Sequence, residues 1–174
     1  AHGFALAASQ NKEREEIHAS GCALARETLR KLWEGVGALG ALMWGAPLQG
    51  NPLTSLMTQW FSPYQTNPLD INPLRGLLRD TVDFELLARE AVHVPKVFVC
   101  ATNVRTGRGE IFAGKRLCME SVMASACLPM MFQAVQIAGE YYWDGGYSGN
   151  PALHPLIYRT QSSDVLLVQI NPVQ

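Results

Sequence analysis

Short apolar runs of strand length are interspersed along the chain with segments of helical periodicity, and this arrangement constrains the fold more than any other feature. Residues 97–101 (VFVCA) and 165–170 (VLLVQI) are continuous apolar runs. Such runs are typical of strands that are covered on both faces. Strands of this kind between helices predict a layered α/β fold.

Helices are predicted where apolar residues recur at helical spacing. Residues 22–36 carry one apolar stripe, and we expect this helix to end near Gly35 and Gly37. Asn72 followed by Pro73 is a good helix opening, because asparagine caps a helix and proline suits its first position. Two more short helices are predicted, over 84–90 after the capping residue Asp83 and over 119–127 before Pro129.

Two hairpins are predicted from turn residues between short apolar segments. Turn chemistry at 106–109 leads from the run at 97–101 into residues 110–113. Residues 135–137 and 141–143 flank a second turn at Ala138, Gly139 and Glu140.

Length and composition predict one globular domain over residues 1–174, because a domain takes on the order of 150 residues. With 17% charged residues and a net charge of −1, the chain is a poor partner for nucleic acid. Its 4 cysteines form no CxxC pair, so we expect reduced thiols, no metal site and a cytoplasmic location.

Residues 35–69 contain no aspartate, glutamate, lysine or arginine. Prolines and glycines interrupt this stretch, so it does not fit a membrane span, which needs about 20 apolar residues in a row. Its large side chains leave two compatible interpretations open. The stretch either packs on the core or forms an apolar wall or lid that takes lipid chains or lies on an interface, through Trp44, Trp60, Phe61 and Tyr64.

One carboxylate stands out as a candidate for chemistry. Asp144 ends a predicted strand and is followed by Gly145 and Gly146. The glycines would let the backbone approach a substrate closely or adopt a positive φ. From this spacing alone, an ordinary tight turn is the favoured explanation, because Asp-Gly pairs are common in such turns.

Several segments together resemble the C-terminal catalytic region of the bacterial patatin-like phospholipases. They are SACLP at 125–129, YWDGGYSGNP at 142–151, ATNVRTG at 101–107, and NPLD and NPLR at 67–70 and 72–75. They follow the order of the family over roughly residues 60–174, which one short motif does not do by chance.

The resemblance implies a three-layer α/β fold with a mainly parallel central sheet, here incomplete at its N-terminus. It also implies a lipid acyl hydrolase that cleaves ester bonds by a serine-aspartate dyad without metal or organic cofactor. Asp144 corresponds to the catalytic base, and Gly145 and Gly146 to its motif loop. We expect the Gly-x-Ser-x-Gly nucleophile and the oxyanion loop upstream of Ala1, so that the 174-residue chain alone is inactive.

No serine or histidine in the chain replaces the expected nucleophile. Ser148 lies in a loop one residue short of the elbow pattern, and Ser121 and Ser125 fall in a predicted helix. We expect these to be structural serines, and His154 to be a surface or packing residue in a loop. The two arginines of the first hairpin, Arg105 and Arg108, suit a lipid phosphate but are more simply solvated charges.

Two alternatives to a hydrolase remain open at this point. The chain could be a non-catalytic relative that keeps a lipid pocket, or a subunit that pairs with a separate N-terminal fragment. The expected partner is a lipid or another acyl ester, and the uncharged stretch adds contact with a membrane surface. The predicted location is therefore cytoplasmic, peripheral to a membrane.

Overall fold

The computed structural model describes residues 1–10, 14–44, 62–149 and 152–168. The N-terminal half is helical, with α1 (His2–Ser9), α2 (Arg14–Trp44), α4 (Pro63–Thr66), α5 (Pro73–Thr81) and α6 (Phe84–Arg89). The rest is mixed, with β1 (Phe98–Asn103), β2 (Gly109–Ala113), α7 (Met119–Ser125), β3 (Val135–Ile137), β4 (Glu140–Asp144) and α8 (His154–Arg159). Two 3-10 turns, η1 (Gly114–Arg116) and η2 (Gly145–Tyr147), follow β2 and β4.

The four strands form one sheet in the order β2-β1-β4-β3, and every neighbouring pair is antiparallel. The prediction of a mainly parallel sheet is therefore wrong. The connections at 104–108 and 138–139 are hairpins, far shorter than the dozen or so residues that a parallel crossover needs. At the second hairpin Ala138 and Gly139 have φ of 50° and 87°, as a two-residue type I′ turn requires.

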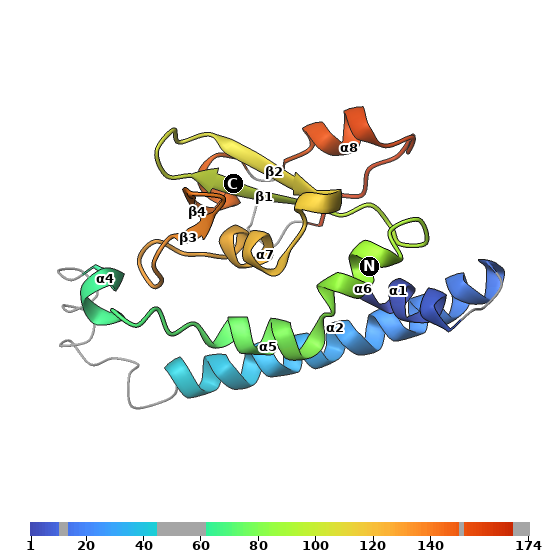
Figure 1. Ribbon diagram of the computed structural model, residues 1–174, viewed down its shortest axis with the longest axis horizontal. Helices are drawn as coiled ribbons and strands as arrows, with labels where there is room; N and C mark the ends of the chain where they lie inside the picture. The colour runs from blue at the N-terminus through green and yellow to red at the C-terminus, as the bar shows by residue number, and fades with distance from the viewer. Residues whose placement is uncertain (11–13, 45–61, 150–151, 169–174) are drawn as a thin grey trace.

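Helix α7 lies between the sheet and the long helices, and the main core forms around it (Figure 1). It contacts β1, β3 and β4 on one side and α5 on the other, while α5 rests on α2. Phe112 and Tyr142 meet edge to face, with ring centroids 5.2 Å apart. The buried residues of this core are Leu78, Ala101, Phe112, Met123, Ala124, Cys127, Val135 and Tyr142.

Helix α2 differs from its prediction, because it continues through the glycines to Trp44. An ideal Cβ on Gly35 would lie 2.5 Å from Leu77 Cδ1 of α5. Gly35 is thus a point of close helix contact and not a helix end. The predicted helix end near Gly35 and Gly37 is therefore wrong.

The two predicted helix caps are confirmed. Asn72 caps α5 by accepting a hydrogen bond from Leu74 N at 3.1 Å, and Asp83 caps α6 by accepting one from Leu86 N at 2.9 Å. Helix α7 and both hairpins also lie where they were expected, and all four cysteines are free.

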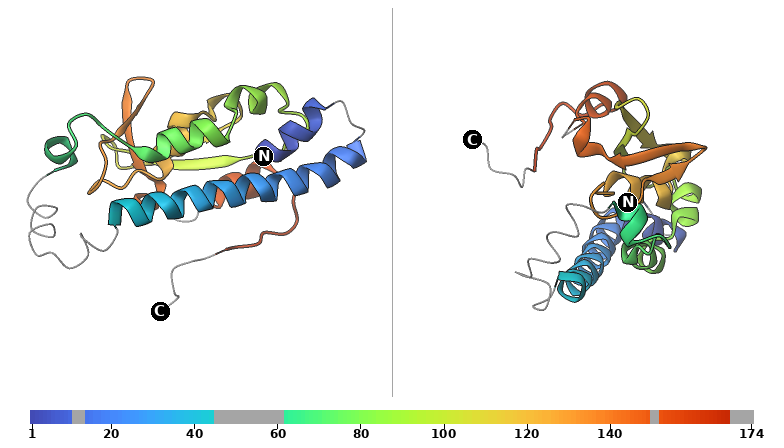
Figure 2. Two further views of the ribbon diagram at one scale, coloured as in Figure 1. Left: turned by 90° about the horizontal axis from the view of Figure 1, so that it is seen from below. Right: turned by 90° about the vertical axis from the view of Figure 1, so that its left-hand side faces the viewer.

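The predicted strand at 165–170 is not confirmed. Residues 165–168 have no regular structure, 169–170 lie outside the described residues, and Leu166 is 91% exposed. Figure 2 shows this segment extending away from the sheet and helices in both views. An apolar run forms a strand only where a neighbouring strand takes its backbone hydrogen bonds, and residues 165–168 join none of the described pairings.

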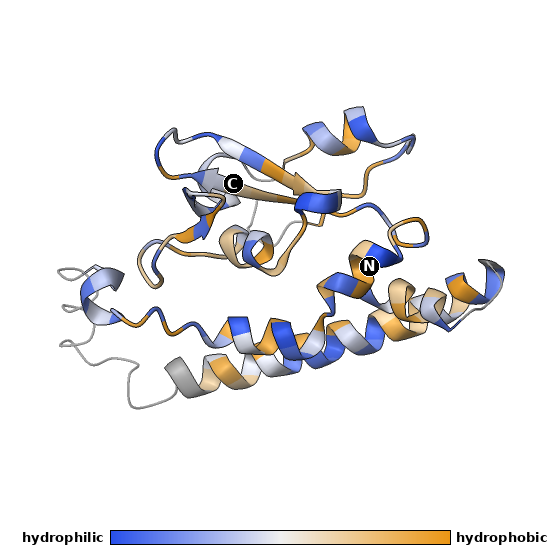
Figure 3. Ribbon diagram, viewed as in Figure 1, coloured by the Kyte–Doolittle hydropathy of each residue, from blue (hydrophilic) through white to orange (hydrophobic). Residues whose placement is uncertain are grey.

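None of the described helices is long and apolar enough to cross a bilayer. Figure 3 shows hydrophilic residues recurring along most of α2, the longest helix. In the uncharged stretch at 35–69, Tyr64 lies on α4 and is half exposed. The side chains of Trp44, Trp60 and Phe61 lie outside the described part of the structure.

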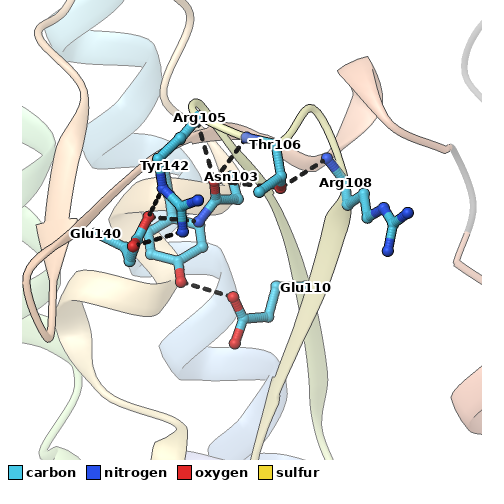
Figure 4. A network of polar contacts seen from close by, with 7 residues as sticks. All are labelled: Asn103, Arg105, Thr106, Arg108, Glu110, Glu140 and Tyr142. Atoms are coloured by element: carbon cyan, nitrogen blue, oxygen red, sulfur yellow. Dashed lines mark hydrogen bonds and ion pairs between the residues drawn. The ribbon is translucent and has the colours of Figure 1, made fainter.

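A polar network joins β1, β2 and β4 at the hairpin end of the sheet (Figure 4). Glu140 accepts from Asn103 Nδ2 at 3.1 Å and pairs with Arg105 at 2.8 Å. The buried Tyr142 donates its hydroxyl to Glu110 Oε2 at 2.6 Å. This bond, together with the Arg116 guanidinium, holds the pKa of Glu110 below its usual range.

Replacing Tyr142 by phenylalanine removes that bond without opening a cavity. We expect Tyr142→Phe to lower the free energy of unfolding by about 1.5–3 kcal/mol at neutral pH, the typical effect of a hydrogen bond to a charged group. The hydrogen bond is at its strongest when Glu110 is ionised. The difference in free energy of unfolding between Tyr142→Phe and the unmodified protein therefore shrinks as the pH falls through the lowered pKa of Glu110. Urea unfolding at pH 7 and in acid measures it, and an equal loss at both pH values would contradict the account.

Candidate functional site

Asp144 lies at the end of β4, and hydrogen bonds on three sides hold it in place. Its backbone N–H donates to Cys127 O at 2.9 Å, and its carbonyl accepts from Thr102 Oγ1 at 2.8 Å. The carboxylate caps η2, because Oδ1 accepts from Gly146 N at 2.7 Å. Among the described residues, no other group is hydrogen-bonded to this carboxylate, so Oδ2 is left for a further partner.

Gly145 is required by packing. An ideal Cβ at this position would lie 2.3 Å from the carbonyl oxygen of Cys100 on β1. Neither Gly145 nor Gly146 has the positive φ seen at Gly107, Gly114 and Gly139. The first glycine of the motif therefore lets η2 approach the neighbouring strand, while the second supplies the N–H that orients Asp144.

A cavity of about 620 Å³ opens beside Asp144. It runs along β1 to Lys96 at the strand's start, and α8 forms part of its wall. Mixed polar and apolar sides of this kind suit a substrate with an apolar chain and a polar reacting group. Its lining includes Lys96, Phe98, Cys100, Ile111, Ser125, Asp144, Gly146 and Leu156.

The three serines near this region are engaged with the backbone. Ser148 accepts from Thr102 Oγ1 at 3.0 Å and donates to Gly145 O at 3.1 Å. Ser125 shares the cavity with Asp144 but donates to Val122 O at 2.8 Å. Ser121 is fully buried and donates to Cys118 O at 2.7 Å. None of them donates to the Asp144 carboxylate, in line with the prediction of structural serines.

Cys100 lies in the cavity next to Asp144, and sequence reasoning missed it. Burial raises the pKa of the Cys100 thiol, and the negative charge of Asp144 raises it further, against a hydrogen bond from Ser148 that lowers it. The thiol therefore stays protonated at neutral pH and is not an activated nucleophile. The pairing of Ala101 with Asp144 sets Cys100 beside Gly145, and residue spacing carries no signal of that pairing.

The remaining candidates either make other contacts or lie outside the described residues. His154 begins α8, not a loop as predicted, and its ring packs on Tyr158 with centroids 4.6 Å apart. Arg105 pairs with Glu140, and Figure 4 shows Arg108 pointing away from that network. Asn150 and Pro151 lie outside the described residues. In the described part of the chain, no group of three or more histidine, cysteine or acidic side chains could hold a metal ion.

Comparison with known proteins identifies the family. Residues 4–157 match the family model described as patatin-like phospholipase. The chain therefore belongs to the patatin-like phospholipase family, which implies a lipid substrate. Searches of curated proteins and of solved structures gave no significant match.

The role of Gly145 is testable by adding one methyl group. Gly145→Ala forces a Cβ against the Cys100 backbone, which cannot move aside as a flexible side chain would. We expect unfolding to become easier by about 1–3 kcal/mol, the usual effect of overpacking. Gly149→Ala is the matched control, because its Cβ would meet nothing within 4 Å. Denaturant unfolding of both variants measures the difference, and similar stability would refute the close approach.

The reactivity of Cys100 reports on the charge of Asp144. Asp144→Asn removes the negative charge that raises the Cys100 pKa, so the thiolate fraction rises. We expect faster alkylation of Cys100 by iodoacetamide at mildly alkaline pH, followed by peptide mass mapping. Cys22, on α2, is the internal reference, because the charge of Asp144 raises the pKa of Cys127 as well as that of Cys100. An unchanged Cys100 rate would place the carboxylate away from the thiol.

Proposed function

We propose that the protein is a lipid acyl hydrolase in which Asp144 is the general base of a serine-aspartate dyad. The observation that carries this proposal is a half-buried carboxylate on a cavity of about 620 Å³, oriented through Oδ1 and with Oδ2 available. Family membership supports the acyl ester as the bond that is cleaved. In this proposal the nucleophilic serine and the oxyanion donors come from a segment outside the 174 residues.

The proposed reaction proceeds through an acyl-enzyme. The serine oxygen attacks the ester carbonyl, and its proton passes to Asp144 Oδ2 as the new bond forms. The tetrahedral intermediate carries its negative charge on the former carbonyl oxygen, where hydrogen-bond donors stabilise it. It collapses by expelling the alcohol, which takes the proton from Asp144. Water then attacks the acyl-enzyme by the same steps and releases the fatty acid.

The contacts of Asp144 support its proposed role as this base. An aspartate is a weak base in water, so proton transfer must be concerted with attack at close range. The hydrogen bonds with Cys127 and Thr102 hold the backbone of Asp144, and the one from Gly146 N orients its carboxylate before substrate arrives. A fixed base avoids the entropy cost of orienting a free one.

Asp144→Asn in the longer parent protein tests the role of the base. We expect kcat for p-nitrophenyl butyrate to fall by at least about 100-fold with little change in KM, because general-base catalysis contributes about 10²–10⁴-fold. The amide still accepts from Gly146 N, so folding is expected to be nearly unchanged. Asp80→Asn is the control, since Asp80 is exposed on α5 and, among the residues that the structure describes, forms an ion pair with Arg79. Retained activity in Asp144→Asn would overturn the assignment.

A non-catalytic lipid-binding relative is the second candidate. The observation that favours it is that Ser121, Ser125 and Ser148 all donate to backbone carbonyls. The sequence ahead of Ala1 in the parent gene separates the two candidates. A Gly-x-Ser-x-Gly there supports the hydrolase, and its absence supports the binding protein. A separate polypeptide carrying that motif would instead support the paired-fragment arrangement, and intact-mass measurement would detect it.

A further inference from the structure

Two loops beside α4 expose large apolar side chains at one end of the molecule. Leu69 is 81% exposed and Ile71 is 63% exposed in the loop that joins α4 to α5. Leu128 and Met130, the latter 64% exposed, lie in the loop that follows α7. We name these four residues, together with the half-exposed Tyr64, the α4 patch. Apolar groups gathered in this way on a surface usually mark a binding site.

Hydrogen bonds fix the two loops of the α4 patch in place. Gln133 Nε2 donates to Asn67 O at 2.8 Å, and Ala134 N donates to the Tyr64 hydroxyl at 3.2 Å. The Asn67 side chain both donates to and accepts from the backbone of Ile71, at 3.0 and 2.9 Å. Figure 1 shows α4 and these loops at the end of the molecule opposite α1. The exposure of Leu69 and Ile71 is thus a property of a hydrogen-bonded loop.

The patch is connected to the candidate site along the chain. Leu128 directly follows Cys127, whose carbonyl accepts the hydrogen bond from Asp144 N at 2.9 Å. None of the patch residues lines the cavity beside Asp144, so substitutions in the patch leave the contacts of Asp144 in place.

The charges around the patch indicate the kind of surface that it fits. Asp70 is the only charged residue in 62–72, and residues 126–135 have none. The preceding residues 45–61 also lack charged side chains in the sequence. Attraction to anionic lipid needs lysine or arginine near the surface, each contributing about 1 kcal/mol. Arg75, three residues beyond the first loop, is paired with Glu120 at 3.7 Å, so its charge is offset. The partner with matching chemistry is therefore a neutral, zwitterionic lipid layer.

We propose that the α4 patch docks the protein on a zwitterionic lipid surface by burying Leu69, Ile71 and Met130 at the level of the head groups. This inference rests on the proposed function for the identity of the substrate as a lipid. It adds which part of the protein contacts the lipid layer, and that this lipid layer carries no net charge.

Flotation with phosphatidylcholine vesicles tests the proposal. We compare the unmodified protein with the triple variant Leu69→Ser, Ile71→Ser and Met130→Ser. We expect the vesicle partition coefficient to fall by about 10-fold or more, because inserted apolar side chains are the source of binding. The matched control is Val92→Ser, which replaces a 92% exposed residue in the turn after α6, away from the patch. Its partitioning should equal that of the unmodified protein.

Further arms separate this proposal from its rivals. We expect binding to be insensitive to high salt and to added phosphatidylserine. Dependence on either would mean an electrostatic surface and would overturn the proposal. Equal partitioning of the triple variant would overturn it too, as would a patch that only mediates self-association in sizing experiments. Circular dichroism and thermal melts establish that the triple variant is folded.

A soluble ester distinguishes failure of the docking proposal from failure of the proposed function. In the longer parent protein, the triple variant should hydrolyse p-nitrophenyl butyrate normally and phosphatidylcholine vesicles poorly. If the parent protein hydrolyses neither substrate but its triple variant still loses vesicle binding, the docking surface is supported and the hydrolase is contradicted. Equal vesicle hydrolysis by variant and unmodified protein would contradict the docking surface alone.

Discussion

The pairing of β4 with β1 is the interaction on which the candidate site depends. It sets Asp144 opposite Ala101 and brings η2 so close to β1 that no Cβ fits at Gly145. Thr102 and Cys127 then bind the backbone of Asp144 from two directions, and Gly146 orients its carboxylate. The network of Tyr142 with Glu110 and of Arg105 with Glu140 ties the same strands together at the hairpin end.

Local features of the fold could be predicted from the sequence because their causes are local. Asn72 and Asp83 cap their helices through their own side chains, and Ala138 and Gly139 form a turn that their positions favour. The pairing of β1 with β4 and the end of α2 depend instead on contacts between distant segments. Gly35 belongs inside a helix only because Leu77 of α5 packs against it. The run at 165–168 has the composition of a strand but lacks a neighbour to pair with among the described strands.

The site could be predicted in part. Asp144 was found because its motif resembles that of a family, and the structure places it on a cavity together with Gly145 and Gly146. The contacts of Cys100 and Thr102 with the motif loop could not be predicted, since they follow from strand pairing over about forty residues. The uncharged stretch at 35–69 predicts an apolar wall or lid that includes Tyr64, but the sequence carries no signal that the loop after α7 lies beside Tyr64.

The central claim is that Asp144 acts on a serine that lies outside these 174 residues. Labelling with a fluorophosphonate, followed by peptide mass spectrometry, tests it most directly. The account predicts no label on the 174-residue chain and one labelled serine in the longer parent, ahead of the residue numbered Ala1 here. Stoichiometric labelling of a serine within the 174 residues would contradict it.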